Sequence, residues 1–203
     1  HVHSDYSLLD GASKITTLIK RAKELNMPAL ALTDHGNMFG VLNFEHICHA
    51  NGINPIVGCE FYVTETDHKV QERTKYGGKY YHLILLCENE TGYKNMSWLC
   101  SNAYTEGLHY GKPNIDFEML KERHEGLICL SACIQGQVPQ ALLHDDDEWA
   151  EEVARKYADL FGPDHYYIEL QDHGLPDQKI AAEKMIKLAE KLNLPLVVTN
   201  DIH

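Results

Sequence analysis

The chain has 203 residues, 44% of them hydrophobic, enough to bury one substantial core in a single domain over residues 1–203. Its formal net charge of −12 argues against binding nucleic acid through a basic surface field. A phosphate-processing site is still compatible with this charge, because bound cations reverse its sign locally. No apolar run approaches the roughly 20 residues that span a bilayer, so we expect no membrane association.

The six cysteines form no C-x-x-C pair and show no spacing typical of small secreted proteins. This usage predicts a reducing, cytoplasmic compartment. Both ends of the chain fall inside motifs, at His1 and at His203, so we expect a domain truncated at both ends from a longer polypeptide.

Short apolar runs alternate with amphipathic segments in the first half of the chain. A helix is predicted over about 13–25 from its 3.6-residue apolar period, and another over about 41–50. Residues 29–32 and 55–57 are predicted to be buried strands, and each leads into polar residues that can bind metals. The polar segment 64–79 is predicted to leave the core as an arm.

The same alternation continues to the end of the chain. Strands are predicted at 82–86, 127–130, 166–168 and 194–198, and helices at 91–102, 116–123, 138–143, 148–161 and 176–192. About seven strand–helix alternations indicate parallel strands with crossover helices, in a barrel-like α/β domain. His82 does not fit this scheme, because it opens its strand instead of closing it.

Candidate metal ligands stand mostly at the ends of these strands. His1 and His3 are two residues apart, so an extended strand would point both imidazoles to one side. Zinc takes three or four such ligands, so the whole set could hold two or three ions. The set is His1, His3, Asp10, His35, Glu60, His82, Cys133, Asp201 and His203.

Each candidate also has an ordinary structural explanation. His35 and His82 could be hydrogen-bonded core histidines, Asp10 a turn residue and Cys133 a packing thiol. Asp34 is favoured as a partner of a ligand or a turn residue rather than a ligand. Structural roles are somewhat favoured for Glu169 and His173, and surface positions for His46, His49, His68, His109, His124, His144 and His165. These structural explanations do not account for nine residues of metal-ligand type placed together at strand ends.

Several phrases in the sequence resemble the polymerase and histidinol phosphatase (PHP) family. They are His1-Val-His3, Thr33-Asp-His-Gly-Asn37, Gly58-Cys-Glu60, His82 and Asp201-Ile-His203. The phrases Tyr6-Ser-Leu-Leu-Asp-Gly-Ala12, His82-Leu-Ile-Leu-Leu-Cys-Glu-Asn-Glu-Thr-Gly-Tyr-Lys-Asn95, Ser131-Ala-Cys133 and Tyr167-Ile-Glu-Leu-Gln-Asp-His-Gly174 are similar to the N-terminal PHP domains of bacterial replicative DNA polymerases, the polymerase III alpha subunits.

The resemblance implies a distorted seven-stranded (β/α) barrel with a trinuclear metal site at the C-terminal rim of its strands. The family's ligands fall on all nine residues of the set above. Asp10 and Cys133 stand where the stand-alone phosphatases often have histidine, and a thiolate favours zinc, with manganese or magnesium as alternatives.

Three functions remain open at this point. The first is a metal-dependent 3′-5′ proofreading exonuclease acting on DNA, with Glu60 bridging two ions and with Asp10 and Asp201 also essential for turnover. The second is a metal-stapled structural domain that supports the polymerase or docks a separate exonuclease among other replicase subunits. The polymerase-like phrases disfavour the third, a small-molecule phosphatase. The nucleotidyl-transfer site of a parent polymerase is not expected within these residues.

Overall fold

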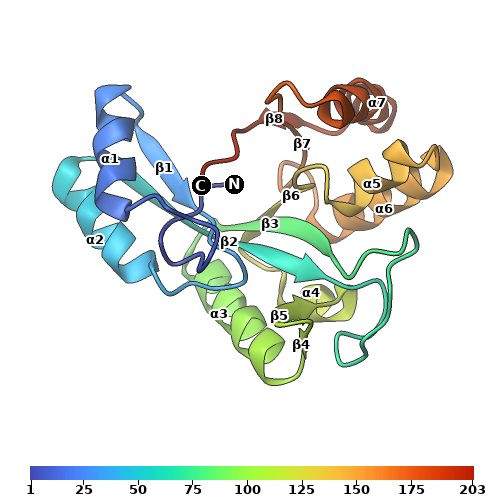
Figure 1. Cartoon of the computed structure of the whole chain (residues 1–203), viewed down its shortest axis with the longest axis horizontal. Helices are drawn as coiled ribbons and strands as arrows, with labels where there is room; N and C mark the ends of the chain where they lie inside the picture. Colours follow the sequence, from blue (N-terminus) through green and yellow to red (C-terminus); the bar gives the residue numbers. More distant parts are fainter.

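A mixed sheet of eight strands runs through the computed structural model, which describes all residues 1–203 (Figure 1). The strands are β1 (Ala29–Leu32), β2 (Asn54–Val63), β3 (Tyr81–Cys87), β4 (Leu108–His109), β5 (Lys112–Ile115), β6 (Leu127–Leu130), β7 (Tyr166–Leu170) and β8 (Leu196–Val198). The helices are α1 (Ile15–Glu24), α2 (Val41–Asn51), α3 (Glu90–Thr105), α4 (Phe117–Arg123), α5 (Gln137–Leu143), α6 (Asp147–Phe161) and α7 (Pro176–Leu192). None of the helices combines the length and apolar character that crossing a bilayer requires.

The long strand β2 connects the two halves of the sheet. Its first half pairs in parallel with β1, and its second half pairs antiparallel with β3 and in parallel with β5. Strand β3 is also antiparallel to β6. Strand β3 is therefore an exception to the expected parallel arrangement, and it is the strand in which His82 did not fit that scheme. The chain leaves the sheet after Val63 and returns in the opposite direction at Tyr81, which agrees with the predicted arm over 64–79.

This reversal explains the position of His82. In the antiparallel register His82 lies opposite Tyr62, close to the C-terminal end of β2. The start of β3 and the end of β2 therefore lie at the same edge of the sheet. A histidine that opens its strand thus reaches the same rim as residues that close theirs.

The two ends of the chain lie side by side, because the segment after β8 runs back to the N-terminus (Figure 1). Val2 forms a parallel bridge with Ile202, and the His3 amide donates to the Ile202 carbonyl at 2.8 Å. On the other side, the Thr33 amide at the end of β1 donates to the Val2 carbonyl at 3.0 Å. The hydrogen-bonded path β1-β2-β3-β6-β7-β8 is thus joined through the terminal segments. This arrangement is consistent with a distorted seven-stranded barrel, with the β4–β5 hairpin outside it.

Side chains that alternate along β2 and β3 point either to the hydrophobic core or to the candidate metal ligands on the opposite face. Phe61, Val63, Leu83 and Leu85 belong to a buried cluster of 27 hydrophobic residues that includes side chains of α3 to α7. Because successive side chains of a strand point to opposite faces, Glu60 and His82 face away from this cluster. A second cluster of 10 buried residues is built by α1, α2, β1 and Ile53. Hydrophobic packing thus fixes the strands that carry the polar residues.

Candidate metal centre

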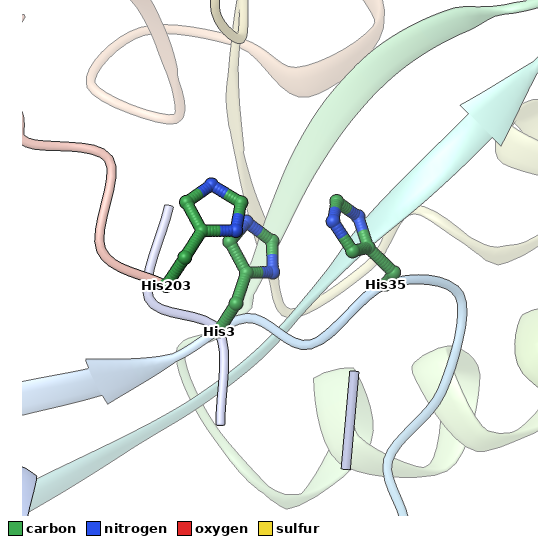
Figure 2. A group of neighbouring side chains, drawn as sticks. All are labelled: His3, His35 and His203. Atoms are coloured by element: carbon green, nitrogen blue, oxygen red, sulfur yellow. The ribbon is translucent and has the colours of Figure 1, made fainter. Parts of the chain in front are cut away.

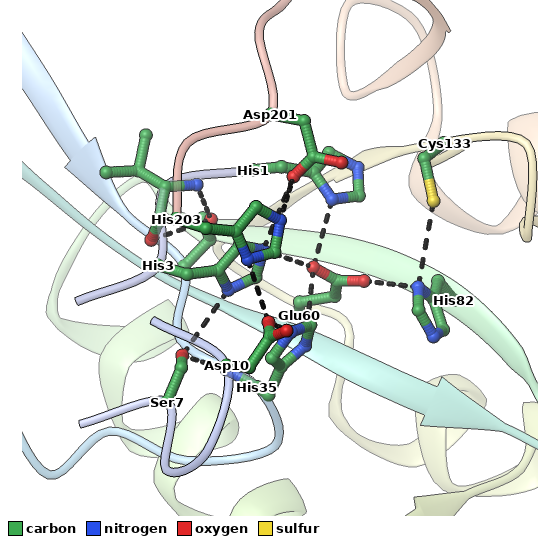
Figure 3. Close-up of polar contacts among 12 residues, drawn as sticks. His1, His3, Ser7, Asp10, His35, Glu60, His82, Cys133, Asp201 and His203 are labelled. Atoms are coloured by element: carbon green, nitrogen blue, oxygen red, sulfur yellow. Dashed lines mark hydrogen bonds and ion pairs between the residues drawn. The ribbon is translucent and has the colours of Figure 1, made fainter. Parts of the chain in front are cut away.

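All nine candidate ligands line one cavity of about 450 Å³ (Figure 3). They come from the terminal segments, from the turn before α1, from the segment after β1, from β2 and β3, and from the loop after β6. The structure therefore brings together residues that are spread from position 1 to position 203. Their role as metal ligands remains a prediction, whereas their convergence is a structural fact.

Glu60 is the centre of this arrangement. Its carboxylate is 1% exposed, and its Oε2 lies 2.9 Å from His1 Nδ1 and 2.9 Å from His3 Nε2. Its Oε1 lies 2.5 Å from His82 Nδ1, but without the geometry of a hydrogen bond. The Cys133 thiol is 3.7 Å from the same His82 nitrogen. A single carboxylate thus has both oxygens directed at imidazoles from different parts of the chain.

A second group of donors lies at the more exposed mouth of the cavity. Asp10 Oδ2 lies 2.6 Å from His35 Nε2 and 2.8 Å from His203 Nδ1. Asp201 Oδ1 lies 2.7 Å from His203 Nε2. The His3 ring stacks on those of His35 and His203, with centroid distances of 3.9 and 4.7 Å (Figure 2). Two carboxylates and stacked imidazoles therefore hold the mouth together.

Backbone strain occurs directly before two of the donors. Leu9 precedes Asp10 with φ of 68°, and Ala132 precedes Cys133 with φ of 67°. Residues other than glycine seldom adopt this left-handed conformation, and strain of this kind is concentrated at functional sites. Both strained peptides aim a donor into the cavity.

The donor set fits divalent cations. Three overlapping triads each have their ligand atoms within 4.8 Å of one another: His3 with His35 and His203, His1 with His3 and Asp201, and His1 with Glu60 and Cys133. Two buried atoms of the same cavity, His35 Nδ1 and Glu60 Oε1, have no hydrogen-bond partner. Buried polar atoms without a partner are costly, and a bound cation is one way to satisfy them.

The charges inside the cavity depend strongly on each other. Burial alone would raise the pKa of Glu60, but the close imidazoles of His1, His3 and His82 hold this pKa well below its usual range. Burial opposes protonation of His82, yet the thiol of Cys133 and the Glu60 carboxylate raise its pKa to about 9. The Glu60 carboxylate therefore stabilises positive charge at the centre of the cavity. Bound cations would supply this positive charge in place of protonated imidazoles.

Asp34 supports the site from behind, in agreement with its expected role beside the ligands. Its carboxylate accepts hydrogen bonds from the Ser4 amide at 2.7 Å, the Ser4 hydroxyl at 2.8 Å and the Ser7 hydroxyl at 2.7 Å. The Ser7 oxygen in turn lies 3.4 Å from His3 Nδ1. These contacts fix the turn that carries Asp10.

Comparison with known proteins shows which family the chain belongs to. The family model described as "PHP domain" matches residues 1–173. The chain belongs to the PHP domain family. The resemblance drawn from the sequence motifs is thereby confirmed.

This PHP domain is similar to part of several curated bacterial proteins. DNA polymerase III subunit alpha of Treponema pallidum is 55% identical over the whole chain, which covers 17% of that protein. The same subunit of Borreliella burgdorferi is 46% identical and that of Thermus aquaticus 44%, with 18% and 17% of their lengths covered. The chain thus spans less than a fifth of these relatives.

Solved structures share the fold of this PHP domain. A candidate metal-dependent phosphoesterase from Bifidobacterium adolescentis aligns with a TM-score of 0.61 at 15% identity, over all of this chain and 86% of its own. An amidohydrolase from Chromobacterium violaceum, solved with bound sulfate and no metal, gives 0.59 at 17% identity and the same coverage. These similarities support the α/β fold class that the sequence predicted.

One residue of the PHP domain is more closely connected to the site than the sequence indicated. Glu169 on β7 is 2% exposed, and its Oε2 faces His1 Nε2 at 3.6 Å. Neither atom has a hydrogen-bond partner, and the hydroxyl of Thr199 donates to the other oxygen of Glu169. The only sequence signal was its place near the end of a strand, where a structural role was favoured. His173 is also nearby, since its Nε2 accepts from the Asp201 amide at 3.3 Å.

Proposed function

We propose that this PHP domain is the N-terminal, metal-dependent phosphoesterase domain of a bacterial replicative DNA polymerase, and that it removes nucleotides from DNA 3′ ends. The observation that carries the proposal is the convergence of nine donors, three of them carboxylates, on one cavity. Similarity to DNA polymerase III alpha subunits supports DNA as the substrate. The site would hold two or three divalent cations, and the Cys133 thiol favours zinc over manganese or magnesium.

The proposed catalytic residues are Asp10, Glu60 and Asp201. Bound cations would activate a water molecule and offset the negative charge on the phosphate oxygens. Glu60 lies between the imidazoles with both oxygens directed into the cavity, which suits a carboxylate shared by two ions. Asp10 and Asp201 orient His35 and His203 at the mouth, where a phosphodiester would enter.

The test is degradation of a 5′-labelled primer with a mispaired 3′ end, comparing Asp201→Asn with the original chain. Loss of a ligand carboxylate should slow product formation at least as much as loss of a residue that only orients a ligand, which is about 10- to 100-fold. Asp177→Asn, an exposed carboxylate at the start of α7, serves as the matched control and should behave like the original chain. Equal degradation by the Asp201 and Asp177 variants would remove this site as the source of the activity.

A parent polymerase would deliver the DNA end, and other replicase subunits, such as a separate proofreading exonuclease, are the protein partners that we propose. The compartment proposed for this assembly is the reducing cytoplasm, and none of the six cysteines forms a disulfide.

A structural role is the second candidate, because the donors tie the two ends of the chain together. His1 and His3 precede the first helix, whereas Asp201 and His203 follow the last strand. Cations bound between them would staple the path that joins β8 to β1. Under this role, Asp201→Asn would lower the melting temperature in the presence of zinc, while no variant would degrade the primer.

A further inference from the structure

A strip of tyrosines and basic side chains begins inside the donor cavity and leads away from it. We define this Tyr–Lys strip by its six residues, which are Tyr62, Arg73, Lys79, Tyr80, Tyr110 and Lys112. Tyr62, Tyr80 and Lys112 line the donor cavity itself. A second cavity of about 340 Å³ is lined by Tyr80 and Lys79 and shares Gln135 with the first. The two cavities are therefore neighbours.

Aromatic contacts connect the inner part of the strip to the candidate ligands. The ring of Tyr80 stacks on His82, with centroids 6.0 Å apart and an interplanar angle of 15°. Tyr62 meets Tyr80 edge-on at 4.6 Å, and Lys112 Nζ lies 5.0 Å from the centroid of Tyr62. An aromatic surface with a cation beside it thus begins at His82.

The outer part of the strip is gathered around Tyr110, at the tip of the β4–β5 hairpin. Lys79 Nζ lies 4.9 Å from its ring centroid, and Arg73 Cζ lies 5.9 Å from it. Tyr110 and Gly111 have φ of 55° and 73°, as in the two-residue type I′ turn of tight hairpins. This tight turn holds an exposed aromatic ring close to two cations.

The cations of the strip have no carboxylate partner, although one guanidinium nitrogen of Arg73 donates to the Gly77 carbonyl at 3.0 Å. No carboxylate lies within 4.0 Å of the Arg73, Lys79 or Lys112 side chain, whereas Lys69 and Lys75 nearby are both paired with carboxylates. The chain as a whole has a net charge of −12. These three cations, of which Lys112 lines the donor cavity and Lys79 the neighbouring one, therefore have a sign opposite to that of the molecule.

We infer that the Tyr–Lys strip binds the single-stranded segment of a nucleic acid whose 3′ end lies in the donor cavity. Alternating cations and aromatic rings suit a single strand, because phosphates pair with the cations while unstacked bases lie against the rings. A duplex keeps its bases stacked and offers no faces to the tyrosines. A small phosphomonoester would fill the donor cavity alone and leave the outer cations unused. This inference rests on the proposed hydrolysis of DNA ends and adds the strand form that the site accepts.

The test is equilibrium binding of a short fluorescein-labelled oligothymidylate, free or paired with oligoadenylate, measured by anisotropy in EDTA so that no hydrolysis occurs. Lys79→Ala combined with Lys112→Ala should flatten the dependence of log affinity on log salt by about 0.7 for each phosphate that no longer has a lysine beside it. Lys179→Ala combined with Lys187→Ala removes two exposed lysines of α7 and is the charge-matched control.

The aromatic part of the strip is tested with Tyr80→Ala, which should weaken binding of the single strand roughly fivefold or more, because a base can no longer stack on the ring. Tyr80→Phe keeps the ring and should bind like the original chain, and Tyr93→Ala on α3 is the control for loss of an exposed tyrosine. The inference is overturned if the duplex binds as tightly as the single strand, if control and strip variants weaken equally, or if the original chain binds nothing at low salt. Each of these results leaves the primer assay with Asp201→Asn unaffected, so the two proposals fail separately.

Discussion

Glu169→Gln tests whether a carboxylate buried behind His1 controls cation binding. The His1 imidazole presents Nδ1 to Glu60 at 2.9 Å and Nε2 to Glu169 at 3.6 Å. The negative charge of Glu169 facing Nε2 favours the ring form that carries its proton on Nε2, which leaves Nδ1 free to bind a cation at the Glu60 side. The amide of glutamine has nearly the same shape but no charge, so the substitution removes the electrostatic part of this contact and leaves the packing intact.

Loss of such a partner typically weakens metal binding by about 10- to 100-fold, which corresponds to roughly 1.4 to 2.8 kcal/mol. We expect the lower end of this range, because the amide oxygen can still accept from His1 while its NH2 group faces the Thr199 hydroxyl. The burial of the site supports a real effect, since the Glu169 side chain has no exposed surface.

The assay is zinc affinity, measured by competition with a chromogenic chelator, together with the number of zinc ions bound per chain. Glu183→Gln, an exposed position on α7 with no ion pair, is the matched control and should keep the original affinity. Circular dichroism spectra of both variants check that the fold is retained. If Glu169→Gln binds zinc like the control, the carboxylate does not position His1 and the reasoning is wrong.

Three further predictions concern stability. Glu60→Gln should abolish the rise in melting temperature that zinc gives the original chain, and an equal rise in both would show that zinc binds elsewhere. Gly92→Ala should destabilise the chain by about 1–3 kcal/mol in urea unfolding, because the new Cβ would lie 1.8 Å from the Gly126 carbonyl oxygen; helix propensity alone predicts a gain. Burial alone would raise the pKa of Asp116, but hydrogen bonds from the His68 and Met119 amides and from the His68 ring hold it below its usual range. The stabilisation from Asp116 should therefore be complete above about pH 4 and be lost as the pH falls through the lowered pKa. Asp116→Asn should remove this part of the acid sensitivity when the free energy of unfolding is measured by urea titration at several pH values. An unchanged pH profile in the variant would contradict the assignment.

Much of the fold could be predicted because local signals agree with the tertiary structure. The apolar runs that ended in polar residues are strands, and α1, α6 and α7 lie close to their predicted ranges. Strand direction could not be predicted, because an apolar run has the same residue pattern whether its strand pairs in parallel or antiparallel. The anomaly at His82 was the one local sign of the reversal in β3.

The candidate site was predictable as a set of residue types but not as a set of contacts. Histidine, aspartate, glutamate and cysteine residues near strand ends indicated that the candidate ligands converge. All nine candidate ligands do line one cavity. The roles of Glu169 and the Tyr–Lys strip could not be predicted, because they depend on neighbours distant in the sequence. His68 shows the same limit, since it was expected at the surface but is 8% exposed and hydrogen-bonded to Asp116 at 2.6 Å.

The bridge between Val2 and Ile202 places the first and last donors of the cavity at adjacent positions. No local part of the chain can assemble these donors, because the first and last of them are separated by the whole of the intervening sequence. During synthesis the cavity would stay incomplete until residue 203 has left the ribosome and joined its partners. A shorter nascent chain would lack Asp201 and His203, so cation binding that needs all nine donors would report that the two terminal segments have met.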